Sequence, residues 1–174
     1  MLTIEQVRHQ DLPHARREQL RLLASEAFDQ FAIVRETRWA APDWTFLGKA
    51  DDGGLACFYH LVERAVRIDG QPVAVAGLNN LITTRAYRGR GLASELLAAS
   101  ERAWFSSLDA RCGLLLCAEA LVPFYQRLGW QRVRSEVRFE QPAGVRTWTA
   151  ECMMLDPTRA AIDPTVIDLC GLPW

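Results

Sequence analysis

The sequence predicts a mixed α/β (α+β) domain in which at least one pair of neighbouring strands is parallel. Two long strand-like runs, 55–68 and 72–84, flank the hairpin signal Asp69-Gly70. A turn and an amphipathic helix then lead to the apolar run 113–117, which is typical of a strand covered on both faces. A strand–helix–strand crossover of this kind joins parallel strands and is right-handed.

The remaining elements follow from local patterns along the chain. Residues 2–8 alternate loosely and favour a strand, and 12–31 carry apolar positions at helical spacing, with Pro13 suited to the first turn. Residues 35–44 follow no clear period and indicate a loop or broken helix. After the helix that begins at Leu92, we expect a short helix over 123–128, ended by Gly129, and two more strands. Those strands are predicted at 130–139 and 145–155.

Length and composition indicate one soluble domain. The chain has 174 residues, of which 49% are hydrophobic and 24% charged. We expect a single domain over 1–174, with 156–174 a proline-punctuated tail packed on it. The formal net charge of −1 argues against general nucleic-acid binding. Neither a signal sequence nor an apolar stretch of about 20 residues is present, so the sequence predicts a cytoplasmic protein without a membrane partner.

The cysteines predict a reducing compartment and no metal site. Their number, five, is odd, and no Cys-x-x-Cys occurs. Four of them, Cys57, Cys112, Cys117 and Cys152, lie in apolar runs, where cysteine behaves as a small buried hydrophobe.

The stretch 87–97, Tyr-Arg-Gly-Arg-Gly-Leu-Ala-Ser-Glu-Leu-Leu, carries the chemistry. Glycines let the backbone approach a ligand, and the first turn of the following helix offers unpaired N–H groups, so the segment predicts a phosphate cradle. The alternative is a basic surface turn before a helix. A Walker P-loop does not fit. A dinucleotide fingerprint fits only in part, because Ser94 stands at its third glycine, which leaves a nucleotide-dependent oxidoreductase as a weaker alternative.

Two spaced motifs resemble one family. Arg88-x-x-Gly91-x-Ala93 resembles the Arg/Gln-x-x-Gly-x-Gly/Ala signature of the GNAT N-acetyltransferase superfamily. The run 121–130, with Phe124-Tyr125 before Gly129-Trp130, is similar to the second half of that family. The resemblance covers roughly residues 55–139 and implies a GNAT-like mixed central sheet with a parallel, splayed strand pair and flanking helices. A looser resemblance points to the aminoglycoside 2′-N-acetyltransferase branch.

The resemblance implies acetyl-CoA as the acyl donor. Its pyrophosphate is then expected on the loop, and its pantetheine arm on the backbone of the preceding strand near a bulge at Asn79-Asn80. The residues that match are Leu81, Ile82, Thr83, Arg88, Gly89, Arg90, Gly91, Ala93 and Ser94.

The implied reaction is direct attack of a primary amine of a small molecule on the thioester. Tyr125 matches the family's general acid, because a phenol can protonate a departing thiolate; the alternative for it is a core aromatic. The general base is not identified, since Asn79 stands where many relatives carry a glutamate. Asn79 is retained as a substrate-binding residue. The candidates for the base are His60, Glu63, Asp43, Glu119 and a water chain, with His60 read first as a buried core residue.

The last residue, Trp174, has two interpretations. Its indole docks to cover the core, or its carboxylate enters the acceptor site, where it holds or helps deprotonate the ammonium; we therefore place Trp174 among both catalytic and substrate-binding residues. Leu172 departs from the acidic residue of the aminoglycoside branch, which favours a smaller or less charged amine. The alternative function is an acyl-CoA-binding module without transferase activity. A homodimer is compatible with either function.

Overall fold

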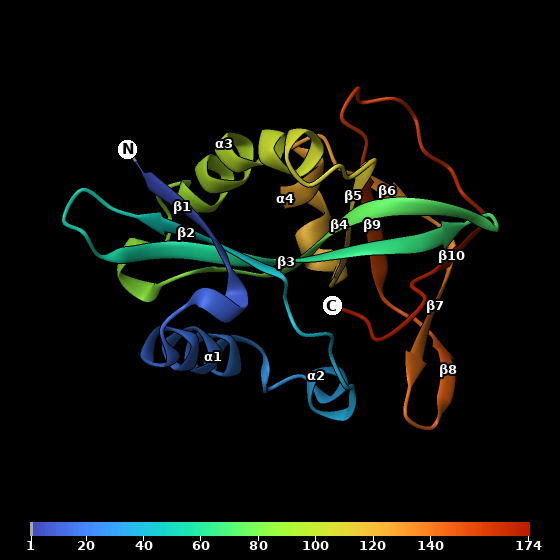
Figure 1. Cartoon of the computed structure of the whole chain (residues 1–174), viewed down its shortest axis with the longest axis horizontal. Helices are drawn as coiled ribbons and strands as arrows, with labels where there is room; N and C mark the ends of the chain where they lie inside the picture. Colours follow the sequence, from blue (N-terminus) through green and yellow to red (C-terminus); the bar gives the residue numbers. More distant parts are fainter. Residues whose placement is uncertain (1) are drawn as a thin grey trace. The chain divides into compact units, whose positions relative to one another are not determined.

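The computed structural model describes residues 2–174 (Figure 1). They form two compact units, the first made of residues 2–37, 42–61 and 79–101 and the second of 38–41, 62–78 and 102–174. The long strands β3 (Leu55–Ile68) and β4 (Gln71–Thr83) and the helix α3 (Leu92–Ser106) each contribute residues to both units. These three elements match the strand-like runs and the helix that the sequence predicts.

The sheet of the first unit begins with β1 (Thr3–Arg8), which was predicted. It pairs antiparallel with β2 (Trp44–Lys49), and β2 pairs antiparallel with β3, so that Thr45 lies opposite His60. Strand β2 was not predicted from the sequence. Four consecutive residues, 45–48, are buried, so burial does not alternate along the strand and a local pattern does not reveal it.

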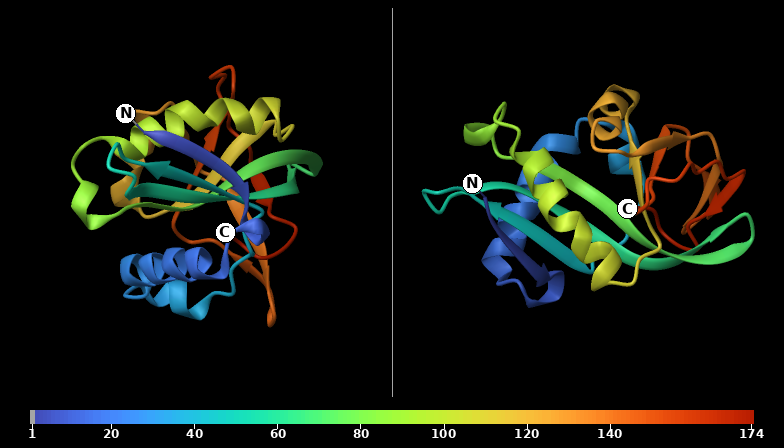
Figure 2. Two further views of the ribbon diagram at one scale, coloured as in Figure 1. Left: turned by 60° about the vertical axis from the view of Figure 1, so that its left-hand side comes forward. Right: turned by 90° about the horizontal axis from the view of Figure 1, so that it is seen from above.

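Helices cover both faces of these strands, as Figure 2 shows. On one face, α1 (His14–Phe28) buries Leu20 in a core cluster with Leu47 and Phe58. On the other face, the Tyr59 hydroxyl shares a 2.6 Å hydrogen bond with Ser100 of α3. Neighbouring residues of a strand point to opposite faces, so Phe58 and Tyr59 separate the two layers.

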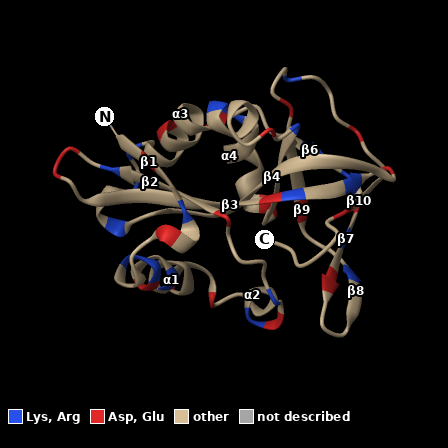
Figure 3. Ribbon diagram, in the orientation of Figure 1, with Lys and Arg blue, Asp and Glu red and all other residues tan. Residues whose placement is uncertain are grey.

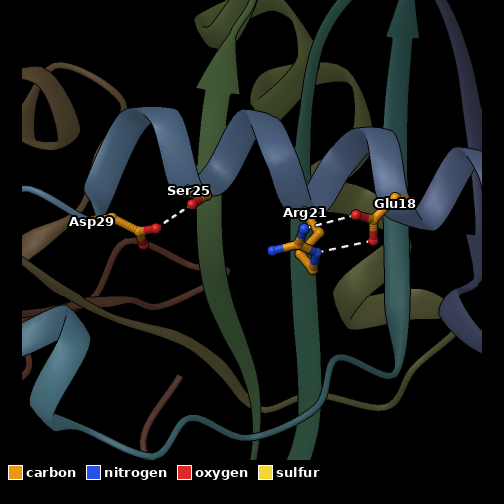
Figure 4. Close-up of polar contacts among 4 residues, drawn as sticks. All are labelled: Glu18, Arg21, Ser25 and Asp29. Carbon is orange, nitrogen blue, oxygen red and sulfur yellow. Dashed lines mark hydrogen bonds and ion pairs between the residues drawn. The ribbon is translucent and has the colours of Figure 1, made fainter.

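Helix α1 ends earlier than predicted. The expected helix ran over 12–31, but α1 stops at Phe28, and Phe31 is 49% exposed just before the short helix α2 (Ala32–Glu36). Figure 4 shows two polar contacts along α1, in which Arg21 pairs with Glu18 and Ser25 donates to Asp29, the residue after the helix. Exposed pairs at this spacing contribute little to stability because solvent screens them, so they identify a solvated helix face.

The second unit contains a mixed sheet. Its strands are hydrogen-bonded in the order β6-β9-β5-β4-β3-β10-β7-β8. Strand β4 pairs parallel with β5 over Val75–Leu78 and Cys112–Leu115, which confirms the predicted parallel crossover. The other strands of this unit are β5 (Cys112–Cys117), β6 (Gln131–Val133), β7 (Glu136–Gln141), β8 (Gly144–Thr147), β9 (Glu151–Leu155) and β10 (Val166–Asp168).

Three predictions for this part of the chain were incomplete. The single strands predicted at 130–139 and 145–155 are each two strands, β6 with β7 and β8 with β9. The tail is also more than a packed segment, because β10 lies between β3 and β7. The Asp69 carboxylate fixes β10 by accepting hydrogen bonds from the N–H groups of Thr165 and Val166. Such pairing depends on residues nearly one hundred positions away, which no local pattern records.

The charge and the cysteines agree with the sequence reading. Figure 3 shows basic and acidic residues interspersed along the ribbon. Cys57, Cys112, Cys117 and Cys152 are buried free thiols, and Cys170 is exposed. Within residues 2–174, the helices are all too short or too polar to cross a membrane.

Candidate functional site

The loop between β4 and α3 has the backbone that the glycine pattern predicts. After Thr83, the N–H of Thr84 donates to the Ala56 carbonyl at 2.9 Å, and the short helix η2 (Arg85–Tyr87) follows. Gly89 and Gly91 then adopt φ angles of 74° and 72°, immediately before α3. Left-handed φ costs other residues about 1–2 kcal/mol, so both glycines are required by the turn.

The space next to these glycines is open. A Cβ atom built on Gly89 or on Gly91 would meet no heavy atom within 4 Å. The first N–H groups of α3 have no partner inside the helix, and the helix dipole favours an anion at this end. The loop therefore offers an accessible row of backbone donors suited to a phosphate group.

Two arginines and a tyrosine hold the loop. Arg88 Nε donates to the Thr83 carbonyl at 3.1 Å, and Arg90 Nη2 donates to the Ala86 carbonyl at 3.2 Å. The Tyr87 hydroxyl donates to Asp52 in the β2–β3 turn, and this hydrogen bond lowers the pKa of the Asp52 carboxyl. Both arginines are exposed, so their guanidinium groups keep donors for an anion.

Strand β4 has a local irregularity where the sequence predicts a bulge. Asn80 adopts a φ of 51° inside the strand. The two-residue turn Asp69-Gly70 places Ile68 opposite Gln71, and counting along both strands places His60 opposite Asn79. The hydrogen bond from the Thr84 N–H to the Ala56 carbonyl places Thr84 opposite Ala56. Counting back from this pair places Asn80, one residue later, opposite His60. One extra residue in β4 at Asn79-Asn80 accounts for both observations.

His60 is buried in a hydrogen-bonded chain. Its Nδ1 lies 2.9 Å from Thr45 Oγ1, which lies 2.8 Å from His9 Nδ1. His60 is 5% exposed, and burial lowers its pKa to about 3. Its interpretation as a core histidine with a satisfied ring nitrogen is confirmed. Neither Thr45 nor His9 was singled out from the sequence, because each bonds to residues distant in the chain.

The other candidates for the base have different surroundings. Asp43 is half-buried before β2, and its backbone bonds to His9 and Leu61. Glu63 follows His60 by three residues in β3 and therefore faces the opposite side of the strand. Glu119 is exposed at the start of the short helix η3 (Glu119–Leu121).

Tyr125 lies in the second unit, on the short helix α4 (Val122–Gln126). Its ring packs edge-on against Phe124 and Trp130, with centroids 5.0 and 5.9 Å away. The side chain is 7% exposed, and burial raises the pKa of its phenol, with the nearby Cys117 thiol adding to the increase. The group is therefore a protonated donor at neutral pH.

Trp174 also lies in the second unit and is 2% exposed. Its Nε1 donates to the Leu114 carbonyl at 3.3 Å, and its ring lies against Gly77, the register partner of Leu114. Arg64 holds the preceding residues by donating from Nη1 to the Leu172 carbonyl at 2.7 Å. The docking of the indole on the core is confirmed, whereas a role for the terminal carboxylate stays a prediction.

The comparisons with known proteins agree with this architecture. Residues 14–133 match the family model described as the acetyltransferase (GNAT) domain, which is more than half of the chain. The chain belongs to the GNAT acetyltransferase family. Its membership places the loop after β4 and the α4 segment within one recognised domain type. The comparison with curated proteins found no match.

Solved structures show the same fold at low sequence identity. Escherichia coli ElaA is 18% identical with a TM-score of 0.60, and the match covers 90% of this chain and all of ElaA. An acyl-CoA N-acyltransferase from Pseudomonas aeruginosa is 18% identical with a TM-score of 0.59, over 89% and 99% of the two chains. Escherichia coli YhbS, solved in complex with CoA, is 14% identical with a TM-score of 0.58, over 97% and 89%. Membership of the aminoglycoside 2′-N-acetyltransferase branch stays a prediction.

Proposed function

We propose that this GNAT-family protein is an acetyl-CoA-dependent N-acetyltransferase that acetylates a primary amine of a small molecule by direct attack. The observation that carries the proposal is the pair of left-handed glycines, Gly89 and Gly91, beside open space at the start of the 15-residue helix α3. The CoA bound in the similar YhbS structure supports the same ligand class here.

The residues of the loop fit a pyrophosphate. Side chains larger than hydrogen at Gly89 and Gly91 would fill the space in front of the loop amides, and both positions leave it open. In our proposal the backbone N–H groups of residues 88–94 bind the pyrophosphate, with Arg88 and Arg90 adding charge. The extended backbone of Leu81, Ile82 and Thr83 is assigned to the pantetheine arm, and an N–H near Leu81 polarises the acyl carbonyl.

Acetyl-CoA supplies the thioester carbonyl that the amine attacks. Tyr125 is assigned as the general acid for the departing thiolate. Its raised pKa supports this role, because the phenol stays protonated at neutral pH. Asn79 is assigned to bind the acceptor amine. The amide oxygen of Asn79 can accept a hydrogen bond from the ammonium form of that amine.

A calorimetric titration with acetyl-CoA, with reduced nicotinamide dinucleotide as the control, tests the donor. Micromolar binding of acetyl-CoA alone supports the proposal, and binding of the nicotinamide cofactor instead would favour an oxidoreductase. Release of free thiol in the presence of small primary amines then tests transfer. Acetyl-CoA binding without thiol release for any amine would favour the second candidate, an acyl-CoA-binding module; the amide at Asn79, in place of an acid, is what favours it.

A further inference from the structure

We propose that His60, Thr45 and His9 form a proton relay that carries the proton of the acceptor amine from the side of Asn79 toward the surface. This inference rests on the proposed function and supplies the base that Asn79 cannot provide. The three side chains come from β3, β2 and the residue that follows β1, all within the first unit. The hydrogen-bonded contacts between them measure 2.9 and 2.8 Å.

The chemistry of the Thr45 hydroxyl couples the two imidazoles. A hydroxyl has one hydrogen to donate and lone pairs to accept, and here it meets Nδ1 of both histidines. With both rings neutral, one Nδ1 donates to Oγ1 while the hydroxyl donates to the other. The Thr45 side chain is fully buried, so water does not replace either contact. A change of tautomer in one ring is therefore transmitted to the other.

The strand register places His60, the inner end of the relay, beside Asn79, the residue assigned to the acceptor amine. Counting from the Asp69-Gly70 turn places His60 opposite Asn79, and directly opposite residues of antiparallel strands point to the same face. Asn79 is half-buried, whereas the four residues before it on β4 are buried. Phe58 and Ile82 share one core cluster on this face, which agrees with the register beyond the bulge.

The outer end of the relay is His9, which is more accessible to solvent than His60 or Thr45. His9 is half-buried, and its ring meets the His60 ring edge-on with centroids 5.0 Å apart. The burial that lowers the pKa of both histidines also keeps both rings neutral at pH 7, as a relay requires. Arg17 lies near His9 and disfavours a stored positive charge there.

The net result of the relay is the transfer of one proton from the ammonium to solvent. Nε2 of His60 takes the proton from the ammonium through one water, and Nδ1–H of His60 passes its hydrogen to Thr45 Oγ1. The Thr45 hydroxyl hydrogen passes to His9 Nδ1, and His9 Nε2 releases a proton to solvent. The neutral amine is left to attack the acyl donor, and a reversal of both tautomers resets the chain.

The test compares Thr45→Val, which keeps the shape and removes the hydroxyl, with Thr45→Ser, which keeps the hydroxyl. Thiol release from acetyl-CoA is measured with phenethylamine, an ammonium ion at neutral pH, and with aniline, which is already neutral. We expect Thr45→Val to lower kcat for phenethylamine about 10-fold or more and to leave the rate with aniline within about twofold. Thr45→Ser should restore the phenethylamine rate. An equal loss for both amines, or no loss, would overturn the relay.

A second measurement separates the relay from the proposed function. Nitrogen-15 shifts of the histidine rings report which nitrogen carries the proton, without any acceptor. We expect one histidine protonated at Nδ1 and the other at Nε2, with both patterns altered by Thr45→Val; His9→Asn serves if that variant does not fold. Histidine tautomers that stay the same after the substitution would overturn the relay. A parent protein that binds acetyl-CoA and shows the coupled tautomers, but releases no thiol with these two amines or with any other amine of a panel, would overturn the transferase role instead.

Discussion

The indole of Trp174 lies directly on the backbone of Gly77. A Cβ atom built on Gly77 would fall 2.3 Å from Trp174 Cε2 and 2.6 Å from Nε1. These distances are too short for a non-bonded contact, so a side chain at this position would displace the indole. The same indole nitrogen bonds to Leu114, the register partner of Gly77 on β5. The last residue of the chain thus covers the parallel β4–β5 pair one position before its register ends at Leu78 and Leu115.

This contact predicts that Gly77→Ala destabilises the protein by about 1–3 kcal/mol, because overpacking a rigid core site displaces the ring. Urea denaturation measures the loss. In a Trp174→Leu background the added methyl meets a smaller side chain, so the same substitution should cost less, and the difference is the coupling energy of the pair. Equal costs in the two backgrounds would show that the indole does not occupy this position.

The sequence predicted the elements whose signals are local. The hairpin of β3 and β4, the glycine loop and α3 follow from periodicity and from turn residues that lie next to one another. Strands β2 and β10 were missed because their evidence is non-local. The β10 residue Val166 bonds to the Asp69 carboxylate 97 positions away, and Thr45 bonds to His60 and His9 across 15 and 36 positions. A threonine in an apolar run carries no local mark of such partners.

The tyrosines allow an acid to be told from a packing residue. Tyr125→Phe removes the hydroxyl and keeps the ring that packs against Phe124 and Trp130, so we expect stability to change little while kcat falls about 100-fold. Tyr59→Phe is the matched control, since it removes the 2.6 Å bond to Ser100 and should cost about 1 kcal/mol without lowering kcat. Thiol release and urea denaturation of both variants decide the matter. An unchanged kcat in Tyr125→Phe would remove the assigned acid.

The loop glycines allow a similar comparison for the acyl donor. Gly91 and Gly70 have φ angles of 72° and 81°, and a Cβ at either site would meet open space. Alanine at each should therefore lower stability by a similar amount, about 1 kcal/mol. Only Gly91→Ala is expected to weaken acetyl-CoA binding, by about tenfold, because only that methyl would stand before the loop amides. Equal affinities in the two variants, measured by calorimetry, would place the pyrophosphate elsewhere.

Burial of His60 predicts an acid-sensitive stability. Its pKa of about 3 in the folded protein lies below the value of 6.5 for a free histidine, so the unfolded chain binds the proton first as the pH falls. The contribution of neutral His60 to stability is therefore fully present above pH 6.5. It is lost progressively toward pH 3, by at most about 1.4 kcal/mol per pH unit. Urea denaturation between about pH 7 and about pH 4 measures the slope. The variant His60→Gln, whose amide can still bond to Thr45, should flatten the slope, and an unchanged slope would assign the acid sensitivity to other groups.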